Sequence, residues 1–295
     1  MVETNGQSPT GGFIDLHSHT NESDGTLAPG ELVSLAKRIG LRALAITDHD
    51  TFRGYEQALP FAHQAGLDLV CGIELNGRMA PGTKRSVHIL AYFPNTGPTP
   101  AFTHWLAREC ASRRDRNQRL AENLQREGLS ISLAEVEQRG KSLTGRPHFA
   151  RVLIDKGYVD SFEQAFDKYL GEQAPSFVPR QSRTAEEVIG AVRDSDGVPV
   201  VAHPIRLGLP RAEEKQLLLR YRDAGLAGLE IYHSEHTPEL QAYYRQLAEE
   251  LGLVPTGGSD FHGDIKPLVS LGTGLQGNVR VPSEFLLRLR SLQPA

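Results

Sequence analysis

Six histidines, two aspartates and one glutamate occupy positions from which their side chains could bind metal ions together. His17 and His19 are two residues apart, so both imidazoles point to the same side of an extended segment. Asp260 and His262 repeat this spacing. Asp24 follows His19 in the adjoining loop, and the other candidates follow or interrupt short apolar runs: His49, Glu74, His88 and His203.

Imidazole and carboxylate ligands without thiolate suit Mn, Zn or Fe and argue against a structural zinc knuckle. Nine candidates exceed one coordination sphere and suffice for two or three ions that share a bridging carboxylate. The alternative, scattered surface polar groups, leaves unexplained why six of the eleven histidines lie at expected strand ends. His63 and His104 lie on helical patterns and are predicted surface residues. Spacing leaves His148, His233 and His236 undecided.

Short apolar runs that lead into these polar residues predict β-strands. The runs are 13–16, 43–46, 69–73, 87–90, 198–202, 228–231 and 253–256. Helical patterns closed by glycine lie between several of them, such as Glu31 to Arg38 before Gly40. Strand alternating with helix predicts an α/β fold with a parallel sheet. Polar chemistry at the strand ends favours a barrel, here a distorted, TIM-like (β/α)7 barrel because about seven runs are present.

The alternation of strands and helices stops over residues 95–183, which are polar and helical in pattern. Helices are expected near 102–127, 133–138, 148–156 and 162–170. We therefore predict a helical insertion domain, residues 95–183, that covers the active site. It would interrupt a barrel domain made of residues 13–94 and 184–295. Residues 1–12 are polar and glycine-rich, and we expect a disordered N-terminal tail there.

Composition excludes several classes of protein. The 295 residues carry a formal net charge of −4, so no global basic surface points to nucleic acid, although a local pocket for one nucleotide stays possible. Cys71 and Cys110 are too few for a disulfide framework. No apolar stretch reaches membrane-spanning length, and no signal peptide is recognisable. We therefore expect a cytoplasmic protein without membrane association, and take it as a monomer.

Several ordered segments form a specific pattern along nearly the whole chain, from residue 13 to about 263. They are Asp15-Leu16-His17-Ser18-His19-Thr20, Ser23-Asp24-Gly25, Ile46-Thr47-Asp48-His49-Asp50, Gly72-Ile73-Glu74, His88, Ala202-His203-Pro204 and Gly258-Ser259-Asp260-Phe261-His262. This pattern resembles the motifs of the PHP (polymerase and histidinol phosphatase) superfamily. The chain length, the insertion and Gly145-Arg146-Pro147-His148 make it most similar to the subfamily that hydrolyses 3′,5′-nucleoside bisphosphates and trims short 5′-phosphorylated RNA.

The resemblance implies three divalent metal positions, with Mn favoured and Zn or Fe as alternatives. The first would be held by His17, His19, Glu74 and Asp260. The second would be held by Glu74 as a bridge, His88 and His203. The third would be held by Asp24, His49 and His262. Asp15 and Asp48 match motif positions outside the ligand set, and there they could either orient neighbouring imidazoles or cap turns.

The resemblance also implies a phosphoric monoester hydrolase that removes the 3′-phosphate of bisphosphates such as pAp, leaving AMP, by attack of metal-bound hydroxide. Clustered cations lower the pKa of a bound water and neutralise developing charge. The expected catalytic residues are Glu74, Asp260 and His233. Arginine forks onto phosphate oxygens, so Arg146 and Arg206 are expected to bind substrate phosphate, with a surface cation as the alternative for each. His233 is expected to contact the reacting phosphate or assist the leaving group, and His148 completes the expected substrate-binding residues.

Three alternatives remain open from the sequence. A histidinol-phosphate phosphatase would use the same metal ligands, although the motif around Arg146 favours nucleotides. A polymerase accessory domain would normally belong to a much longer chain. A binding module with a decayed metal site would lack part of the ligand set, which is complete here.

Overall fold

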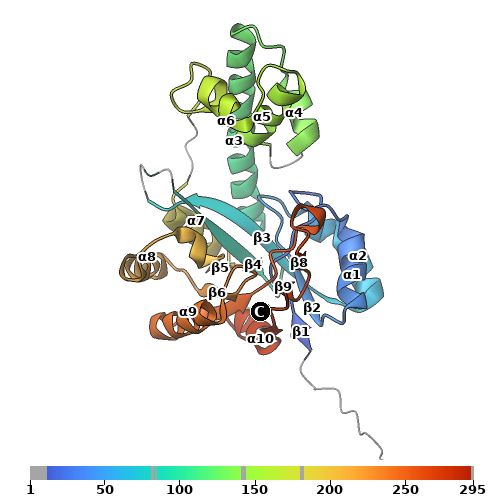
Figure 1. Ribbon diagram of the computed structural model, residues 1–295. Coiled ribbons are helices and arrows are strands. Elements are labelled where there is room, and N and C mark those ends of the chain that lie inside the picture. The colour runs from blue at the N-terminus through green and yellow to red at the C-terminus, as the bar shows by residue number, and fades with distance from the viewer. Residues whose placement is uncertain (1–11, 81–82, 84, 141–143, 180–182, 294–295) are drawn as a thin grey trace, which may run out of the picture.

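The computed structural model describes residues 12–80, 83, 85–140, 144–179 and 183–293 (Figure 1). The protein has an α/β fold around a curled sheet of six strands, in the spatial order β2-β3-β4-β5-β6-β7. The strands are β2 (Ala43–Ile46), β3 (Asp68–Arg78), β4 (Ser86–Phe93), β5 (Val198–Val201), β6 (Gly228–Tyr232) and β7 (Val254–Gly257). Each lies on one of the apolar runs of the sequence.

The expectation of a purely parallel sheet is wrong at β4. Strands β2 and β3 are parallel, as are β5, β6 and β7, but β4 runs antiparallel to both β3 and β5. The segment between Arg78 and Ser86 is too short for a helical crossover, which needs about a dozen residues or more, so β3 and β4 form a hairpin. As a result Glu74 lies within β3 and not at its end.

The N-terminal segment lies between the two edges of the sheet. Its short strand β1 (Phe13–Ile14) pairs with β10 (Val281–Pro282). Beyond β1, the Asp15 amide donates to the Ala43 carbonyl of β2, and the Leu16 amide donates to the Gly257 carbonyl of β7, each at 3.1 Å. Isolated bridges, and not a continuous ladder, therefore connect the segment to both edges.

Helices cover the outer face of the sheet. They are α1 (Pro29–Arg38), α2 (Arg53–Ala65), α7 (Ala185–Arg193), α8 (Arg211–Asp223) and α9 (Pro238–Leu251). Alternate residues of the buried strands pack on opposite faces. Ile89 of β4 packs outward in a cluster with α7, α8 and α9, whereas Leu90 and Tyr92 belong to an inner cluster. Phe285 of α10 (Glu284–Ser291) joins that inner cluster.

The helices between β4 and α7 extend away from the sheet to the top of Figure 1. They are α3 (Pro100–Arg126), α4 (Leu133–Gly140), α5 (Arg146–Asp155), α6 (Phe162–Ala165) and a π-helix, η2 (Phe166–Leu170). Phe102, near the start of α3, packs in the cluster of the sheet, but Leu120 and Leu124 belong to a separate apolar cluster with α4 and α5. The segment thus has an apolar core of its own.

Short elements complete the fold: η3 (Pro204–Leu207), η4 (Gly263–Ile265), β8 (Val269–Ser270) and β9 (Gly274–Leu275). The expected tail, residues 1–12, lies outside the described residues except for Gly12. No helix in the described part of the chain combines the length and the apolar composition that a membrane span requires.

Candidate metal centre

The nine candidate ligands meet where the parallel strands of the curled sheet reach their carboxyl ends. Several follow the carboxyl ends of the parallel strands, as His49 follows β2 and Asp260 follows β7. His88 lies near the start of β4. Because β4 is antiparallel to its neighbours, its start lies beside the carboxyl ends of the parallel strands. The reversal of β4 therefore does not separate His88 from the other ligands.

Two of these residues have backbone angles that L-residues rarely adopt. Asp260 has φ of 55° and His203 has φ of 27°. Hydrogen bonds fix both: the Asp260 amide donates to the His17 carbonyl at 2.9 Å, and the His203 amide donates to Glu230 Oε2 at 2.6 Å. Such strained residues concentrate at functional sites.

A first group of ligands surrounds one oxygen of Glu74. Glu74 Oε2 lies 3.4 Å from His17 Nε2 and 3.2 Å from His19 Nε2. Asp260 Oδ1 lies 3.5 and 3.4 Å from the same two nitrogens. All four side chains are buried. These are the four residues that the family resemblance assigned to the first metal position.

The other oxygen of Glu74 faces a second group. Glu74 Oε1 lies 2.7 Å from His88 Nδ1 and 3.0 Å from His203 Nε2. One carboxylate thus contacts ligands of two groups, as the bridging assignment requires. A cavity of about 200 Å³ opens beside this group, lined by Ser86, Val87, His88, Ala202, His203, Arg206 and Leu207.

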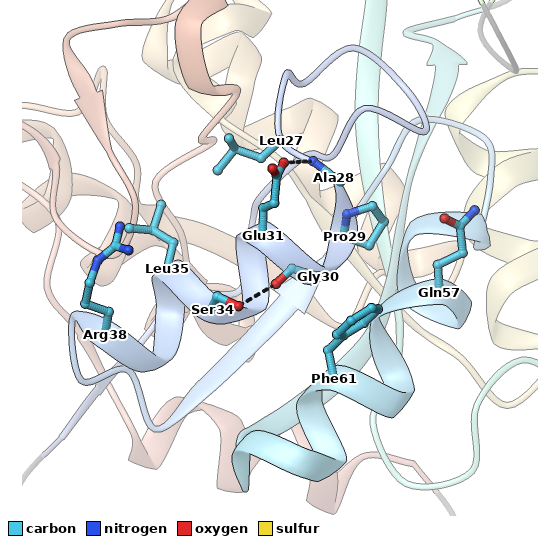
Figure 2. A pocket seen from close by; sticks show the side chains of 10 residues that line it. All are labelled: Leu27, Ala28, Pro29, Gly30, Glu31, Ser34, Leu35, Arg38, Gln57 and Phe61. Carbon is cyan, nitrogen blue, oxygen red and sulfur yellow. Dashed lines mark hydrogen bonds between the residues drawn. The ribbon is translucent and has the colours of Figure 1, made fainter.

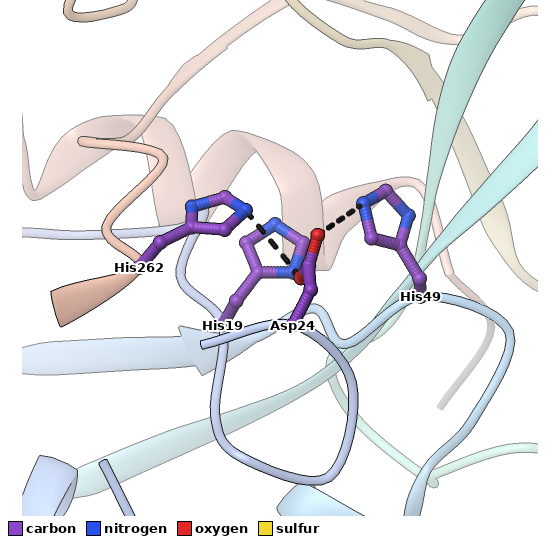
Figure 3. Close-up of side chains that lie close together, drawn as sticks. All are labelled: His19, Asp24, His49 and His262. Carbon is purple, nitrogen blue, oxygen red and sulfur yellow. Dashed lines mark ion pairs between the residues drawn. The ribbon is translucent and has the colours of Figure 1, made fainter. Parts of the chain in front are cut away.

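A third group lies around Asp24 (Figure 3). Asp24 Oδ1 lies 3.4 Å from His262 Nε2 and 3.5 Å from His19 Nδ1, and Asp24 Oδ2 lies 3.6 Å from His49 Nε2. His49 Nε2 also lies 3.3 Å from Glu74 Oε2. The imidazoles of His19 and His49 thus stand between the first and third groups, so the three groups form one continuous cluster.

The geometry of the cluster fits divalent metal ions. Two ligands that each lie about 2.1 Å from an ion at a tetrahedral angle are about 3.4 Å apart, close to the nitrogen–oxygen separations found here. His17 Nε2 and both ring nitrogens of His19 are buried without a hydrogen-bond partner. Such orphaned polar atoms are costly unless something binds them. The donor set of imidazole and carboxylate suits Mn, Zn or Fe.

Hydrogen bonds fix the tautomers that this chemistry needs. The Nδ1–H of His17 donates to Glu230 Oε1 at 2.9 Å, and that of His262 donates to the Asp260 carbonyl at 2.8 Å. In both rings the Nε2 lone pair then faces the carboxylates of the cluster. This arrangement is the usual one for metal-binding histidine.

The cluster has a strongly anionic field. Burial alone would lower the pKa of His19, but Asp260 and Glu74 raise it to about 10. Burial would raise the pKa of Glu74, but the charges of His49 and His88 hold it well below its usual range. The charges that raise the pKa of His19 also attract metal cations, whose binding would displace the proton from that imidazole. Burial has the larger effect on His49 and His203 and lowers the pKa of each to about 4.

Asp15 and Asp48 cap the loops that carry the ligands. Asp15 accepts hydrogen bonds from the amides of His17 and Ser259, at 3.1 and 3.0 Å. Asp48 accepts from the Thr20 amide and the Thr20 hydroxyl, at 2.8 and 2.6 Å. Among the described residues, both carboxylates therefore bond backbone and hydroxyl groups beside the ligands and no imidazole, which favours the capping role of the two that the sequence left open.

Glu230 is a site residue that the sequence analysis did not assign. It lies fully buried on β6, accepting from His17 and from the His203 amide. Burial would raise its pKa, but the charge and hydrogen bond of His17 lower it to about 2. The only signal in the sequence is one glutamate within the apolar run Gly228-Leu229-Glu230-Ile231.

We predict that Glu230→Gln weakens metal binding by roughly 10- to 100-fold, as losing a residue that supports a ligand usually does. If the amide oxygen of glutamine accepts from His203, its NH₂ group faces His17 Nδ1 and favours the tautomer with a proton on Nε2. Glu214 is a matched control, because it is also buried and accepts two hydrogen bonds, from Tyr243 and Tyr244. Elemental analysis showing equal metal content in Glu230→Gln and Glu214→Gln would contradict the role.

The predicted substrate residues divide into two sets. His233 Nδ1 accepts from the Glu235 amide at 3.1 Å, so Nε2 carries the proton and donates to Asp260 Oδ2 at 3.2 Å. Arg206 Nη2 lies 2.6 Å from Glu235 Oε1 and 3.2 Å from Asp260 Oδ2. Lys266 Nζ, which the sequence analysis did not single out, lies 2.6 Å from the same Asp260 oxygen. These three groups adjoin the cluster.

Arg146 and His148 lie in the helical segment. The Arg146 guanidinium stands over the rings of Phe166 and Phe177 and donates to the Leu170 carbonyl at 3.2 Å. These contacts favour a structural role within the helical segment. His148 Nδ1 accepts from the Gly145 amide at 3.2 Å. Burial lowers the pKa of His148, and the hydrogen bond with Gly145 and the charge of Asp24 oppose this.

The first helix of the segment also contacts a metal-ligand loop. Arg113 of α3 pairs with Asp50, which follows His49 and has φ of 53°. Among the described residues, His63 and His104 have no place in the cluster, and His236 is buried with its Nδ1–H on the Ile231 carbonyl.

A larger cavity, of about 630 Å³, lies between α1 and α2 (Figure 2). Its lining contains no histidine. Two of its polar side chains bond the backbone of α1. Glu31 Oε2 accepts from the Ala28 amide at 2.8 Å, and the Ser34 hydroxyl donates to the Gly30 carbonyl at 2.8 Å. This groove is therefore distinct from the metal centre.

Known proteins resemble the chain over most of its length. The sequence profile of the PHP domain matches residues 15–174. A 5′-3′ exoribonuclease of Escherichia coli is 32% identical over 268 residues, which are 89% of each chain. A 3′,5′-nucleoside bisphosphate phosphatase of Chromobacterium violaceum is 30% identical over 251 residues, 84% of this chain and 87% of that protein.

One solved structure, that of a proposed metal-dependent phosphoesterase from Bifidobacterium adolescentis, covers 97% of this chain and 98% of its own. It superposes with a TM-score of 0.72 at 31% identity. The chain therefore belongs to the PHP domain family and is a metal-dependent phosphoesterase. The family predicted from the motifs is confirmed.

Proposed function

We propose that this enzyme removes the 3′-phosphate of nucleoside 3′,5′-bisphosphates such as adenosine 3′,5′-bisphosphate. The observation that carries the proposal is the continuous cluster of six imidazoles and three carboxylates, with hydrogen-bond donors from Arg206, His233 and Lys266 on Asp260. The choice of a nucleotide substrate is supported by the resemblance to the Chromobacterium violaceum phosphatase. We further propose three bound ions, with manganese preferred.

Bound divalent ions would lower the pKa of a water molecule and neutralise charge on the phosphate. The chain's own residues hold and orient the reactants. Arg206 presents its guanidinium beside Asp260, where Glu235 fixes it with hydrogen bonds of 2.6 to 3.2 Å. The Nε2–H of His233 points to the same place and can donate to a phosphate oxygen or to the departing 3′-oxygen.

We also propose two features of the architecture. Residues 13–19 would act as the seventh strand of a distorted (β/α)7 barrel, which their hydrogen bonds to β2 and β7 support. Residues 95–183 would form an insertion domain that covers the active site. The contact of Arg113 of α3 with Asp50 supports this placement.

A second candidate activity is trimming of short 5′-phosphorylated RNA from its 5′ end. The resemblance to the Escherichia coli exoribonuclease supports it. Both activities would place a 3′-oxygen–phosphorus bond at the metal centre and require a phosphate on the 5′-oxygen. They differ only in whether another nucleotide follows.

We predict that the kcat/KM for adenosine 3′,5′-bisphosphate exceeds that for adenosine 3′-monophosphate by about 10- to 150-fold. One charged hydrogen bond to the additional phosphate is worth roughly 1.5–3 kcal/mol, and binding energy from a non-reacting group can orient the reacting ester. Phosphate release is measured on both nucleotides, on histidinol phosphate and on 5′-phosphorylated oligoribonucleotides. Indifference to the 5′-phosphate, or a preference for histidinol phosphate, would refute the nucleotide assignment.

A further inference from the structure

The two oxygens of the Asp260 carboxylate face different surroundings. Oδ1 faces the metal-binding nitrogens, at 3.5 Å from His17 and 3.4 Å from His19. Oδ2 faces cationic or hydrogen-donating groups: Lys266 Nζ at 2.6 Å, Arg206 Nη2 at 3.2 Å and His233 Nε2 at 3.2 Å. Asp260 thus separates the candidate ions from a group of donors.

The positive charge beside Asp260 Oδ2 exceeds the single negative charge of the Asp260 carboxylate. Lys266 and Arg206 contribute two positive charges, and one carboxylate carries a single negative charge. Glu235 bonds Arg206 through both of its oxygens, so Arg206 is already compensated. An ion on Oδ1 would withdraw further negative charge from Asp260. Lys266 would then be a cation without full compensation beside the metal centre.

The chain holds Lys266 in this place. It follows η4, and its amide donates to the Gly263 carbonyl at 3.1 Å. The neighbouring Asp264 amide donates to the Thr26 hydroxyl at 3.0 Å, which ties the turn to the loop that carries Asp24. The Lys266 side chain is 30% exposed. Part of the side chain is therefore open to solvent, although its backbone is fixed.

We propose that Lys266 binds the reacting phosphate group, together with Arg206 and His233. An ammonium group has three donors that rotate freely, so it can keep one on Asp260 and direct the others to phosphate oxygens. It has no lone pair for a metal ion and so does not compete for the ions. Because Lys266 adjoins Asp260 of the first group, it contacts the phosphate at the metals and not a distant second one. This inference rests on the proposed function.

The test compares Lys266→Met with the wild-type protein, both loaded with Mn. Methionine keeps an unbranched apolar stem of similar length and removes the charge. Isothermal titration with inorganic phosphate should show binding about tenfold weaker in Lys266→Met, equivalent to about 1.4 kcal/mol. The kcat/KM should fall by similar factors for adenosine 3′-monophosphate and adenosine 3′,5′-bisphosphate, because both present the reacting phosphate. Lys266→Arg should restore part of the affinity for phosphate.

Lys215→Met is the matched control, because Lys215 also pairs with a carboxylate, Glu250, at 2.8 Å, but on the exposed surface of α8 and α9. It should change neither quantity. Elemental analysis should find the same Mn content in every variant, and circular dichroism checks folding. Lys266→Gln provides a second uncharged variant if Lys266→Met does not fold.

Equal affinity for phosphate in the wild type and Lys266→Met would overturn the inference. A loss of phosphate binding accompanied by a loss of Mn would also overturn it, because Lys266 would then only support Asp260 as a ligand. The proposed function fails in a different way: the wild type itself would then hydrolyse neither nucleotide. If the wild type is active and Lys266→Met has the same phosphate affinity and kcat/KM, the role of Lys266 is refuted and the proposed function stands.

Discussion

Replacing Glu74 with alanine should cause the largest loss of activity of any single substitution in the cluster. Its two oxygens face different groups, His19 and His49 on one side and His88 and His203 on the other. Loss of a residue that merely supports a ligand costs roughly 10- to 100-fold. Loss of a shared ligand disturbs two ion positions, so we expect kcat/KM to fall by at least about 1,000-fold.

Phosphate release from adenosine 3′,5′-bisphosphate and the Mn content measure this effect. Glu74→Gln, which keeps the volume but removes the charge, should lose activity nearly as far. Glu214→Ala is the control for removing a buried glutamate side chain. Glu214 lies on α8 and accepts from Tyr243 and Tyr244 of α9, away from the cluster. It should keep its metal and its specific activity. A Glu74→Ala protein with normal Mn content and activity would exclude Glu74 as a bridge.

Sequence spacing predicted the parts of the site that depend on local geometry. His17 and His19 are two positions apart, as are Asp260 and His262, and each pair lies in the cluster. The apolar runs before the ligands predicted the strands for the same reason, since burial of a short strand leaves a local pattern in the sequence.

Strand direction and side-chain partners could not be predicted in this way. The direction of β4 is set by the length of the preceding connection, and this placed Glu74 within a strand and not at its end. Glu230 carries no periodic signal, because its role depends on His17, which lies far away in the sequence. Lys266 is likewise defined by a contact with Asp260 that only the folded loop creates.

Arg146 is a residue that the sequence singled out but whose contacts it did not predict. Its place in a motif suggested a contact with phosphate, but its guanidinium lies over two phenylalanine rings of the helical segment. Arg206, on the short helix after His203, is the arginine that reaches the cluster, through Asp260. A motif identifies a residue of interest, but the chain that surrounds it decides which partner it meets.

After the loss of activity in Glu74→Ala, the next largest effect is expected from metal removal. It should lower the free energy of unfolding as well as the activity. Without ions, His17 Nε2 and both ring nitrogens of His19 are buried without a hydrogen-bond partner. Ions that bind the native state alone stabilise it by roughly 2.7 kcal/mol when the free ion is at 100 times its Kd. Urea unfolding of chelator-stripped protein, with and without Mn, measures the difference in unfolding free energy. An identical midpoint and slope in both samples would contradict the assignment of the cluster as a metal centre.

The most direct test of a metal-dependent phosphoesterase at this cluster is phosphate release from adenosine 3′,5′-bisphosphate by one preparation before stripping, after stripping and after Mn is restored. We expect activity to disappear on stripping and to return with Mn, reaching its plateau only after more than one equivalent per chain has bound. Undiminished hydrolysis by the stripped protein would contradict the account. So would the absence of hydrolysis when Mn occupies the cluster.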